Sequence, residues 1–178
     1  MNPYISVVVK PTLECDIGCR HCYHRPEERV KGHVSIDDVD RLFRMVSREY
    51  ESAWFIWHGG EPLTLPLSFY KQVLDLQDKY FGVSNNRVGN TIQTNGVGID
   101  RKFANFCRDR KVNIGVSHEG PYNDVLRQKS QISDANLAYL SKKDHVFSVN
   151  STISAETVGR QTEIYRHFRD RGINQTLS

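Results

Sequence analysis

Apolar, β-branched runs alternate with amphipathic stretches along nearly the whole chain, and this alternation restricts the fold more than any other feature. The apolar runs predict strands at residues 4–12, 53–60, 89–96, 112–120, 145–154 and 173–178. The stretches between them predict helices at residues 35–50, 67–82, 100–110, 133–143 and 160–172. Alternation of this kind favours a parallel sheet with helices packed outside it.

The number of units limits the architecture further. Five strand–helix units and a sixth strand fit within 178 residues, whereas a complete eight-unit barrel needs about 200 to 250 residues. We therefore expect an α/β fold of the TIM type, a partial (β/α)6 barrel with parallel strands. We expect one domain over residues 1–178, truncated near its sixth strand and therefore incomplete at the C-terminus.

The apolar run at residues 4–12 predicts a buried strand. Local signals also support two of the predicted helices. Ser35 and Asp38 form a possible capping pair at the start of the first helix. Gly82 is placed to end the second. One face of the first helix is apolar, with Ile36, Val39, Leu42, Phe43 and Val46 at helical spacing.

Charge and cysteine content exclude several classes of protein. The net charge is only +3 and the basic residues are scattered, which argues against nucleic-acid binding. No apolar run is long enough to span a membrane, and the first residues lack the pattern of a secretion signal. Three of the four cysteines lie within eight positions, which suits a metal in a reducing compartment better than disulfides. We expect a cytoplasmic protein that does not bind membranes.

Polar and glycine-rich clusters follow the predicted strands at their C-terminal ends, where parallel barrels carry their active sites. The clusters are the loop CDIGCRHCY (15–23), HGGEP (58–62), QTNG (93–96), SHEGP (117–121) and SVNST (148–152). Because these ends meet at one edge of a parallel sheet, we expect the five clusters to form a single site.

Cys15, Cys19 and Cys22 are spaced Cys-x3-Cys-x2-Cys, one ligand short of a complete metal cage. Three thiolates in one loop can hold three irons of a cubane cluster and leave the fourth iron open to a substrate. Alternatives are a zinc site completed by His21 or His24, or cysteines without any ligand. An electron-transfer cluster would need a fourth nearby cysteine. Cys107 lies between apolar residues of a predicted helix, so we assign it to the core.

The cysteine spacing after a first strand, together with GGEP (59–62), QTNG and SHEGP, resembles the radical S-adenosylmethionine (radical SAM) superfamily. Within it, the motifs are similar to the branch of anaerobic sulfatase-maturing enzymes and peptide-modifying (SPASM-type) maturases, here only the N-terminal core barrel. The resemblance implies a [4Fe–4S] cluster on the three cysteines that chelates S-adenosylmethionine. One electron then splits the sulfonium bond, and the resulting 5′-deoxyadenosyl radical removes hydrogen from a substrate.

The resemblance also implies which residues contact the nucleotide. The carbonyl groups of Gly59 and Gly60, with the charge of Glu61, would meet the ammonium group, because residues without a Cβ allow close approach. Asn95 and Ser117 would bind the ribose or the carboxylate. The remaining candidates are Arg127 for the methionine carboxylate, His21 and Tyr23 beside the adenine, and the weaker Gln93 and Asn150.

Two positions depart from the pattern of the branch. His21 stands where an aromatic residue is usual, and Glu119 stands where Ser-x-Asp-Gly-Pro has Asp. The extra methylene group of Glu119 puts any exact geometric role of that carboxylate in doubt. His58 has no assigned role and is expected to face the substrate or to serve the structure.

We therefore expect a radical SAM enzyme, an oxidoreductase that matures a peptide or protein by hydrogen abstraction from a side chain. A peptide or protein substrate and an electron donor such as flavodoxin or ferredoxin are the expected partners. Alternatives are a small-molecule substrate or a non-catalytic zinc-binding module. The group that acts as acid or base is not identified by the sequence.

Overall fold

The computed structural model describes residues 2–24, 27, 30–83, 87–143 and 145–177. A single parallel sheet runs in the order β1-β2-β3-β4-β5-β6, with each strand beside the next strand of the sequence. The strands are β1 (Asn2–Val9), β2 (Tyr50–Trp57), β3 (Val88–Thr94), β4 (Asn113–Ser117), β5 (Phe147–Ser151) and β6 (Gln175–Leu177). The prediction of a partial (β/α)6 barrel is confirmed.

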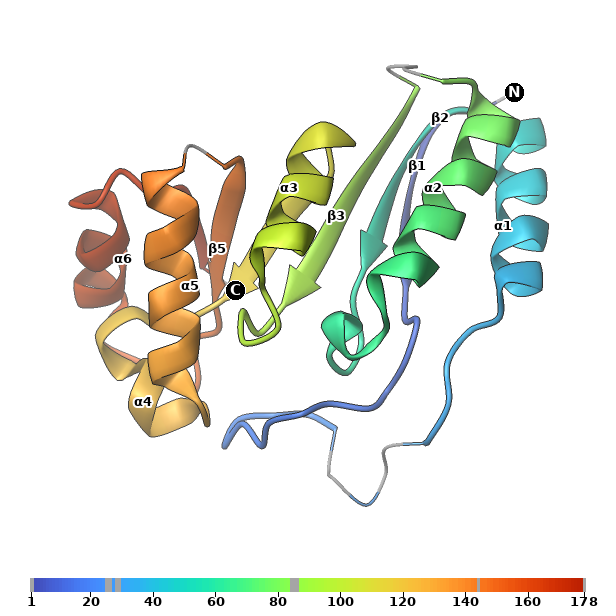
Figure 1. Cartoon of the computed structure of the whole chain (residues 1–178). Helices are drawn as coiled ribbons and strands as arrows, with labels where there is room; N and C mark the ends of the chain where they lie inside the picture. The colour runs from blue at the N-terminus through green and yellow to red at the C-terminus, as the bar shows by residue number, and fades with distance from the viewer. Residues whose placement is uncertain (1, 25–26, 28–29, 84–86, 144, 178) are drawn as a thin grey trace.

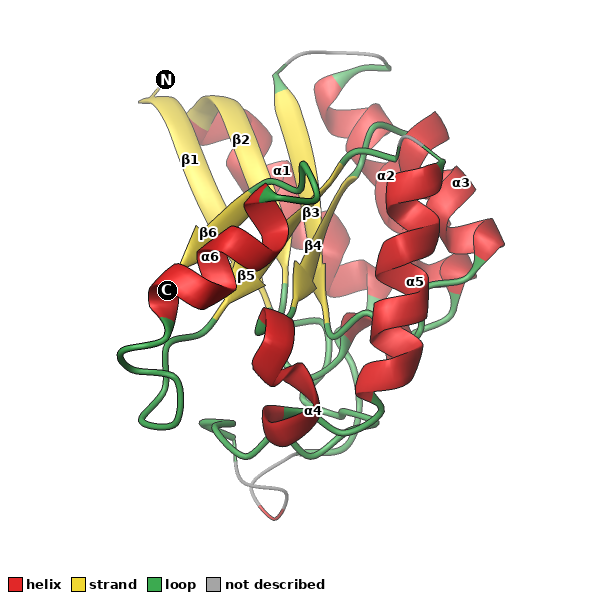
Figure 2. Ribbon diagram, turned by 90° about the vertical axis from the view of Figure 1, so that its left-hand side faces the viewer, coloured by secondary structure: helices red, strands yellow, loops and turns green. Residues whose placement is uncertain are grey.

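Helices cover the outer face of the sheet, which curls from β1 towards β6 (Figure 2). They are α1 (Ile36–Glu49), α2 (Leu67–Phe81), α3 (Arg101–Asp109), α4 (Asn123–Leu126), α5 (Ser130–Lys142) and α6 (Gln161–Arg169). Two 3-10 turns, η2 (Pro62–Thr64) and η3 (Gly120–Tyr122), follow β2 and β4. None of the described helices combines the length and the apolar character needed to cross a membrane.

The hydrophobic core lies between the sheet and these helices. Phe43 of α1 packs edge-on against Phe55 and Trp57 of β2 and against Phe81 of α2. Burial of such large aromatic side chains supplies much of the free energy of folding. Cys107 is 1% exposed within this core, as predicted.

Both local helix signals are confirmed. The Ser35 hydroxyl accepts from the backbone N–H of Asp38, and the Asp38 carboxylate accepts from that of Ser35, so the two residues form a capping box. Gly82 ends α2 with a φ of 86°, a conformation that favours glycine. These caps fix the ends of two helices that hold the outer face of β2.

The prediction of a buried strand at 4–12 is wrong in two respects. The strand ends at Val9, and its residues alternate between half-buried and exposed. Ile5, Val7 and Val9 pack against the core, whereas Tyr4 and Val8 are 56% and 59% exposed. Since side chains alternate across a strand, the exposed set faces the inner side of the curled sheet.

Two further differences concern the segment after β4. The short helix α4 was not predicted, because residues 123–126 form barely one turn. Helix α5 begins at Ser130, three residues before the predicted start. The strand prediction for 173–178 is confirmed over Gln175–Leu177; Ser178 lies outside the described residues.

Candidate active site

A cavity of about 170 Å³ lies at the C-terminal ends of the strands. Its wall contains residues from all five predicted clusters, so these clusters do form one site. Figure 1 shows the strand arrows pointing towards this end of the sheet. Among the predicted residues, the lining includes Cys15, Cys19, His21, Cys22, Tyr23, Gly59, Gly60, Glu61, Gln93, Asn95, Ser117 and Arg127. Asn150 is not among the lining residues.

Backbone hydrogen bonds hold the cysteine loop against distant parts of the chain. The N–H of Gly18 donates to Gln128 Oε1 at 3.0 Å, and the N–H of Arg20 donates to the carbonyl of Leu126 at 2.9 Å. Cys19 therefore lies between two anchors, one at the last residue of α4 and one on the segment that follows it. Burial raises the pKa of the Cys19 thiol, and the nearby Arg127 guanidinium partly offsets this effect.

The glycines after β2 are needed for close packing of the cysteine loop. The N–H of Gly60 donates to the carbonyl of Thr12 at 2.9 Å, and the N–H of Glu61 donates to that of Glu14 at 2.7 Å. A Cβ on Gly60 would clash with the carbonyl oxygen of Glu14. Gly59 has a φ of +133°, and its Cβ would lie 2.6 Å from the oxygen of Thr12. The space expected for a ligand at these Cβ positions is thus filled by backbone.

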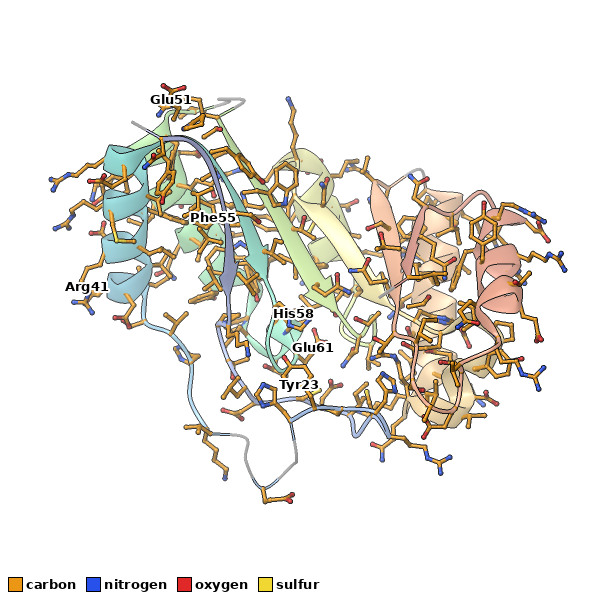
Figure 3. The ribbon with its side chains drawn as sticks, turned by 180° about the vertical axis from the view of Figure 1, so that it is seen from behind. Tyr23, Arg41, Glu51, Phe55, His58 and Glu61 are labelled. Atoms are coloured by element: carbon orange, nitrogen blue, oxygen red, sulfur yellow. The ribbon has the colours of Figure 1, made fainter. Side chains whose placement is uncertain are left out.

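Glu61 links the ends of β2 and β3. Its Oε1 accepts from the N–H of Leu63 at 2.9 Å and from the hydroxyl of Thr94 at 2.7 Å. Its Oε2 accepts from the N–H of Asn95 at 2.7 Å. The side chain is buried, and burial raises its pKa to about 7 in spite of these three donors. Figure 3 shows Glu61 near His58 and Tyr23, and all three residues line the cavity.

This raised pKa makes stability depend on pH. The folded chain binds the Glu61 proton more tightly than the unfolded chain, so the stabilisation is present below about pH 4.5 and is lost as the pH rises through about 7. From pH 4.5 to pH 8, we expect the unfolding free energy of the parent to fall by about 3 kcal/mol relative to that of Glu61→Gln. Urea unfolding followed by circular dichroism at several pH values measures it. Parallel pH profiles for the two proteins would contradict the assignment.

A chain of amide and hydroxyl groups crosses the inner face of the sheet. Asn150 Nδ2 donates to Gln93 Oε1 at 2.6 Å, and Gln93 Nε2 donates to the Ser117 hydroxyl at 2.8 Å. Gly115 leaves the space in which the Gln93 side chain lies, because a Cβ there would clash with it. Asn150 therefore reaches the cavity through Gln93 and Ser117. Asn95 is also engaged, since its Nδ2 donates to Asp16 Oδ1 at 2.8 Å.

Arg127 and Glu119 form a buried bidentate ion pair. Arg127 Nε lies 2.5 Å from Glu119 Oε2, and Nη2 lies 2.7 Å from Oε1. The same guanidinium contacts Cys19 Sγ through Nη1 at 3.5 Å and His21 Nε2 through Nη2 at 3.3 Å. The predicted carboxylate-binding arginine thus already holds a carboxylate of its own chain, and Glu119 has a defined geometric role that the sequence comparison left in doubt.

The ring of His21 is neutral and carries its proton on Nδ1. A guanidinium only donates, so Nε2 must be the acceptor for Arg127. Burial, and then the charge of Arg127, lowers the pKa of His21. The buried Nδ1 has no hydrogen-bond partner among the described residues. It is therefore a donor available to a ligand in the cavity.

Tyr23 and His58 lie at another part of the wall. Tyr23 is 64% exposed, which excludes a place in the core, and its ring lies 4.3 Å from that of His24. His58 Nδ1 accepts from the N–H of Gly59 at 2.6 Å, so Nε2 carries the proton of the neutral ring. Burial, followed by the charge of Lys10, lowers the pKa of His58. His58 is thus a neutral donor at the cavity.

The sequence did not single out every residue of the wall. Ile17, Thr94 and Thr152 also line the cavity. The N–H of Thr152 donates to Glu119 Oε1 at 3.3 Å, which fixes the ion pair to the end of β5. Thr152 closes the polar SVNST cluster, so its position after a strand was a usable signal. Ile17 carried no such signal because it is an apolar residue within a loop.

The donor set of the cavity fits an iron–sulfur cubane. All three clustered cysteines line the same cavity, and all are free of disulfides. No group of three or more His, Cys, Asp or Glu side chains in the described part of the chain converges on one metal-ion position. A cubane has no such requirement, because each thiolate binds a different iron.

Comparisons with known proteins agree with this site. The family model described as "Radical SAM superfamily" matches residues 9–174, and the chain belongs to this superfamily. The [4Fe–4S] cluster is the cofactor of the family, and S-adenosylmethionine is the molecule that the cluster binds in it. The fold and the cysteine loop are thus those of a radical SAM core.

Among curated relatives, the chain is 35% identical over 134 residues to a serine-type anaerobic sulfatase-maturating enzyme of Bacteroides thetaiotaomicron, covering 70% of this chain and 32% of that protein. It is 29% identical over 188 residues to a cysteine-type enzyme of Clostridium perfringens, covering 95% and 50%. The chain spans half or less of the length of these relatives.

Solved structures show the same fold. Native anSMEcpe with bound AdoMet and the Kp18Cys peptide superposes with a TM-score of 0.87 at 22% identity, over 98% of this chain and 51% of that one. Streptococcus suis SuiB bound to its precursor peptide SuiA gives a TM-score of 0.73 at 16% identity, over 99% and 39%. These structures share the fold, and the resemblance to the maturase branch rests on the curated sulfatase-maturating relatives.

Proposed function

We propose that the chain is the core of a radical SAM enzyme that cleaves S-adenosylmethionine and abstracts hydrogen from a side chain of a peptide or protein. The observation that carries the proposal is the shared cavity. Three cysteines in one loop, the glycines after β2 and a buried guanidinium all line it. The relatives named as sulfatase-maturating enzymes support a peptide substrate.

Cys15, Cys19 and Cys22 would hold the cluster, and the fourth iron would have no cysteine ligand from the part of the chain that the structure describes. When bound, the cluster supplies the electron that splits the sulfonium bond and so generates the 5′-deoxyadenosyl radical. The protein contributes binding, orientation and exclusion of water. The anchors at Gly18 and Arg20 keep the loop in place for this task.

Several donors of the wall suit S-adenosylmethionine. Arg127 has five N–H groups, four of which are used by Glu119, Cys19 and His21, so one N–H of Nη1 is left for the methionine carboxylate. The unpaired Nδ1–H of His21 suits a ring nitrogen of adenine. The proposed contacts with the rest of S-adenosylmethionine are Tyr23, Gly59, Gly60, Glu61, Asn95 and Ser117. Asn150 would act on it through Gln93 and Ser117.

The inner face of the sheet carries apolar surface that suits a peptide side chain. Tyr4 and Val8 leave apolar surface exposed on the inner face of the sheet, where a substrate side chain can lie. The proposed electron donor is a protein such as flavodoxin or ferredoxin. None of the four cysteines forms a disulfide in the described structure, which agrees with a reducing cytoplasmic location that we also propose.

Isotope transfer tests the proposal. The chain is reconstituted anaerobically with iron and sulfide and then incubated with dithionite, S-adenosylmethionine and synthetic peptides that carry a β-deuterated cysteine or serine. We expect 5′-deoxyadenosine to form and to contain deuterium from the peptide. Unlabelled 5′-deoxyadenosine with every peptide would contradict the peptide substrate. A reconstituted protein that never cleaves S-adenosylmethionine would contradict the activity of this core.

A further inference from the structure

The ion pair of Glu119 and Arg127 is directed at one particular cysteine. Glu119 has no exposed side-chain surface, and the side chain of Arg127 is 10% exposed. The carboxylate binds the edge of the guanidinium formed by Nε and Nη2, so the remaining Nη1 is directed away from it. That group lies 3.5 Å from Cys19 Sγ.

Both partners of the pair are held by the backbone around them. Glu119 Oε1 accepts from the N–H of Thr152, and the N–H of Glu119 donates to Asn123 Oδ1 at 3.3 Å. The N–H of Arg127 donates to the carbonyl of Asn123 at 2.8 Å, which ends α4. The position of the guanidinium is therefore fixed by β5 and α4 before any ligand enters.

The backbone around Cys19 is also held in place by hydrogen bonds. The hydrogen bonds of Gly18 and Arg20 fix the loop to residues 126–128, on both sides of Cys19. The distance between Sγ and Nη1 is thus set by the fold and not by a flexible surface contact. A charged donor at this distance from a ligand sulfur stabilises the extra electron of a reduced cluster.

Glu119 limits this effect, because its negative charge lies next to the same guanidinium. The two charges act on Cys19 with opposite sign, and the guanidinium is the nearer one. We propose that Arg127 is a positioning residue that raises the reduction potential of the cluster through Cys19, and that Glu119 both orients it and restrains the rise. This inference rests on the proposed function, since it requires a cluster on the three cysteines.

The potential of the reconstituted cluster, measured without S-adenosylmethionine by redox titration with electron paramagnetic resonance, tests the inference. Glu119→Gln keeps the shape of the side chain but removes its charge. We expect it to raise the ratio of reduced to oxidised cluster about tenfold at fixed potential, a shift of about 59 mV for one electron. The double variant Glu119→Gln/Arg127→Met leaves no buried unpaired charge, and we expect its ratio to fall at least tenfold below that of Glu119→Gln.

Lys129→Met is the matched control. The side chain of Lys129 is 43% exposed and pairs with Asp16 of the cysteine loop at 3.1 Å. Its replacement by methionine removes one positive charge, as Arg127→Met does. Because water screens an exposed charge, we expect the ratio to change less than twofold. Circular dichroism of each variant confirms that it is folded, and iron analysis shows that it is loaded.

The outcomes separate the two proposals. Loaded variants whose ratios all stay within twofold of the parent would overturn the inference and leave the proposed function intact. Differences that appear only after S-adenosylmethionine is added would also overturn it, since Arg127 would then act on the methionine carboxylate alone. A parent chain that binds no cluster would overturn the proposed function, and the inference with it.

Discussion

A chain in which Cys15, Cys19 and Cys22 are all replaced by alanine is expected to stay colourless after anaerobic reconstitution and to form no 5′-deoxyadenosine above background. The parent should turn brown and hold about four irons at one cluster. The reason is the shared cavity, in which these three are the only cysteine sulfurs among the described residues. Iron analysis, the visible spectrum and chromatography of the products measure the effect.

Cys107→Ala is the control for this prediction. Cys107 is buried in the core, and burial raises the pKa of its thiol to about 12, so it is a poor source of thiolate. The variant should keep the colour and the product with only a modest loss of stability. If the triple variant still bound a cluster, or if Cys107→Ala lost it, the assignment of the ligands would be wrong.

Gly60→Ala is expected to destabilise the chain by about 3 kcal/mol and to prevent stable loading of the cluster. The new methyl group would clash with backbone atoms of Leu13 and Glu14, which cannot rotate away as a side chain can. Relief requires the start of the cysteine loop to move away from β2, which breaks the bond from the N–H of Glu61 to Glu14. Urea unfolding measures the stability, and iron content measures the loading.

Gly18→Ala, which lies in the cysteine loop that Gly60 approaches, is the matched control. The nearest atom to its added Cβ is Gln128 Nε2 at 3.4 Å, an ordinary contact with a side chain. We expect its stability to change by less than about 1 kcal/mol and the cluster to load normally. Equal effects of the two substitutions would show that the close approach of Gly60 to the loop is unimportant.

The repeating pattern of strands and helices was sufficient to predict the fold. β2 to β5 and their helices lie close to the predicted ranges, because their apolar residues face one continuous core. β1 was misread because a run of valines looks buried, although Tyr4 and Val8 face the open inner side. Helix α4 was missed because four residues are too few for a periodic signal.

The membership of the site was easier to predict than its contacts. Motifs at strand ends identify the lining residues, because parallel strands bring those ends together. The partner of Arg127 was not predictable, since the bidentate contact depends on how α4 turns back toward Glu119. The requirement for glycine at position 60 was also not predictable, because the atoms that exclude a Cβ there lie 46 residues earlier, at Glu14.

The anchors of the cysteine loop have a consequence for the order of assembly. The bond from the N–H of Gly18 to Gln128 joins positions 110 residues apart, and that from Arg20 to Leu126 is nearly as long-range. During synthesis the three cysteines leave the ribosome early, but their final spacing is reached only after α1 and three further strand–helix units have been made. Iron insertion that depends on this spacing therefore follows the synthesis of residues up to Gln128, and the thiols must stay reduced throughout that interval.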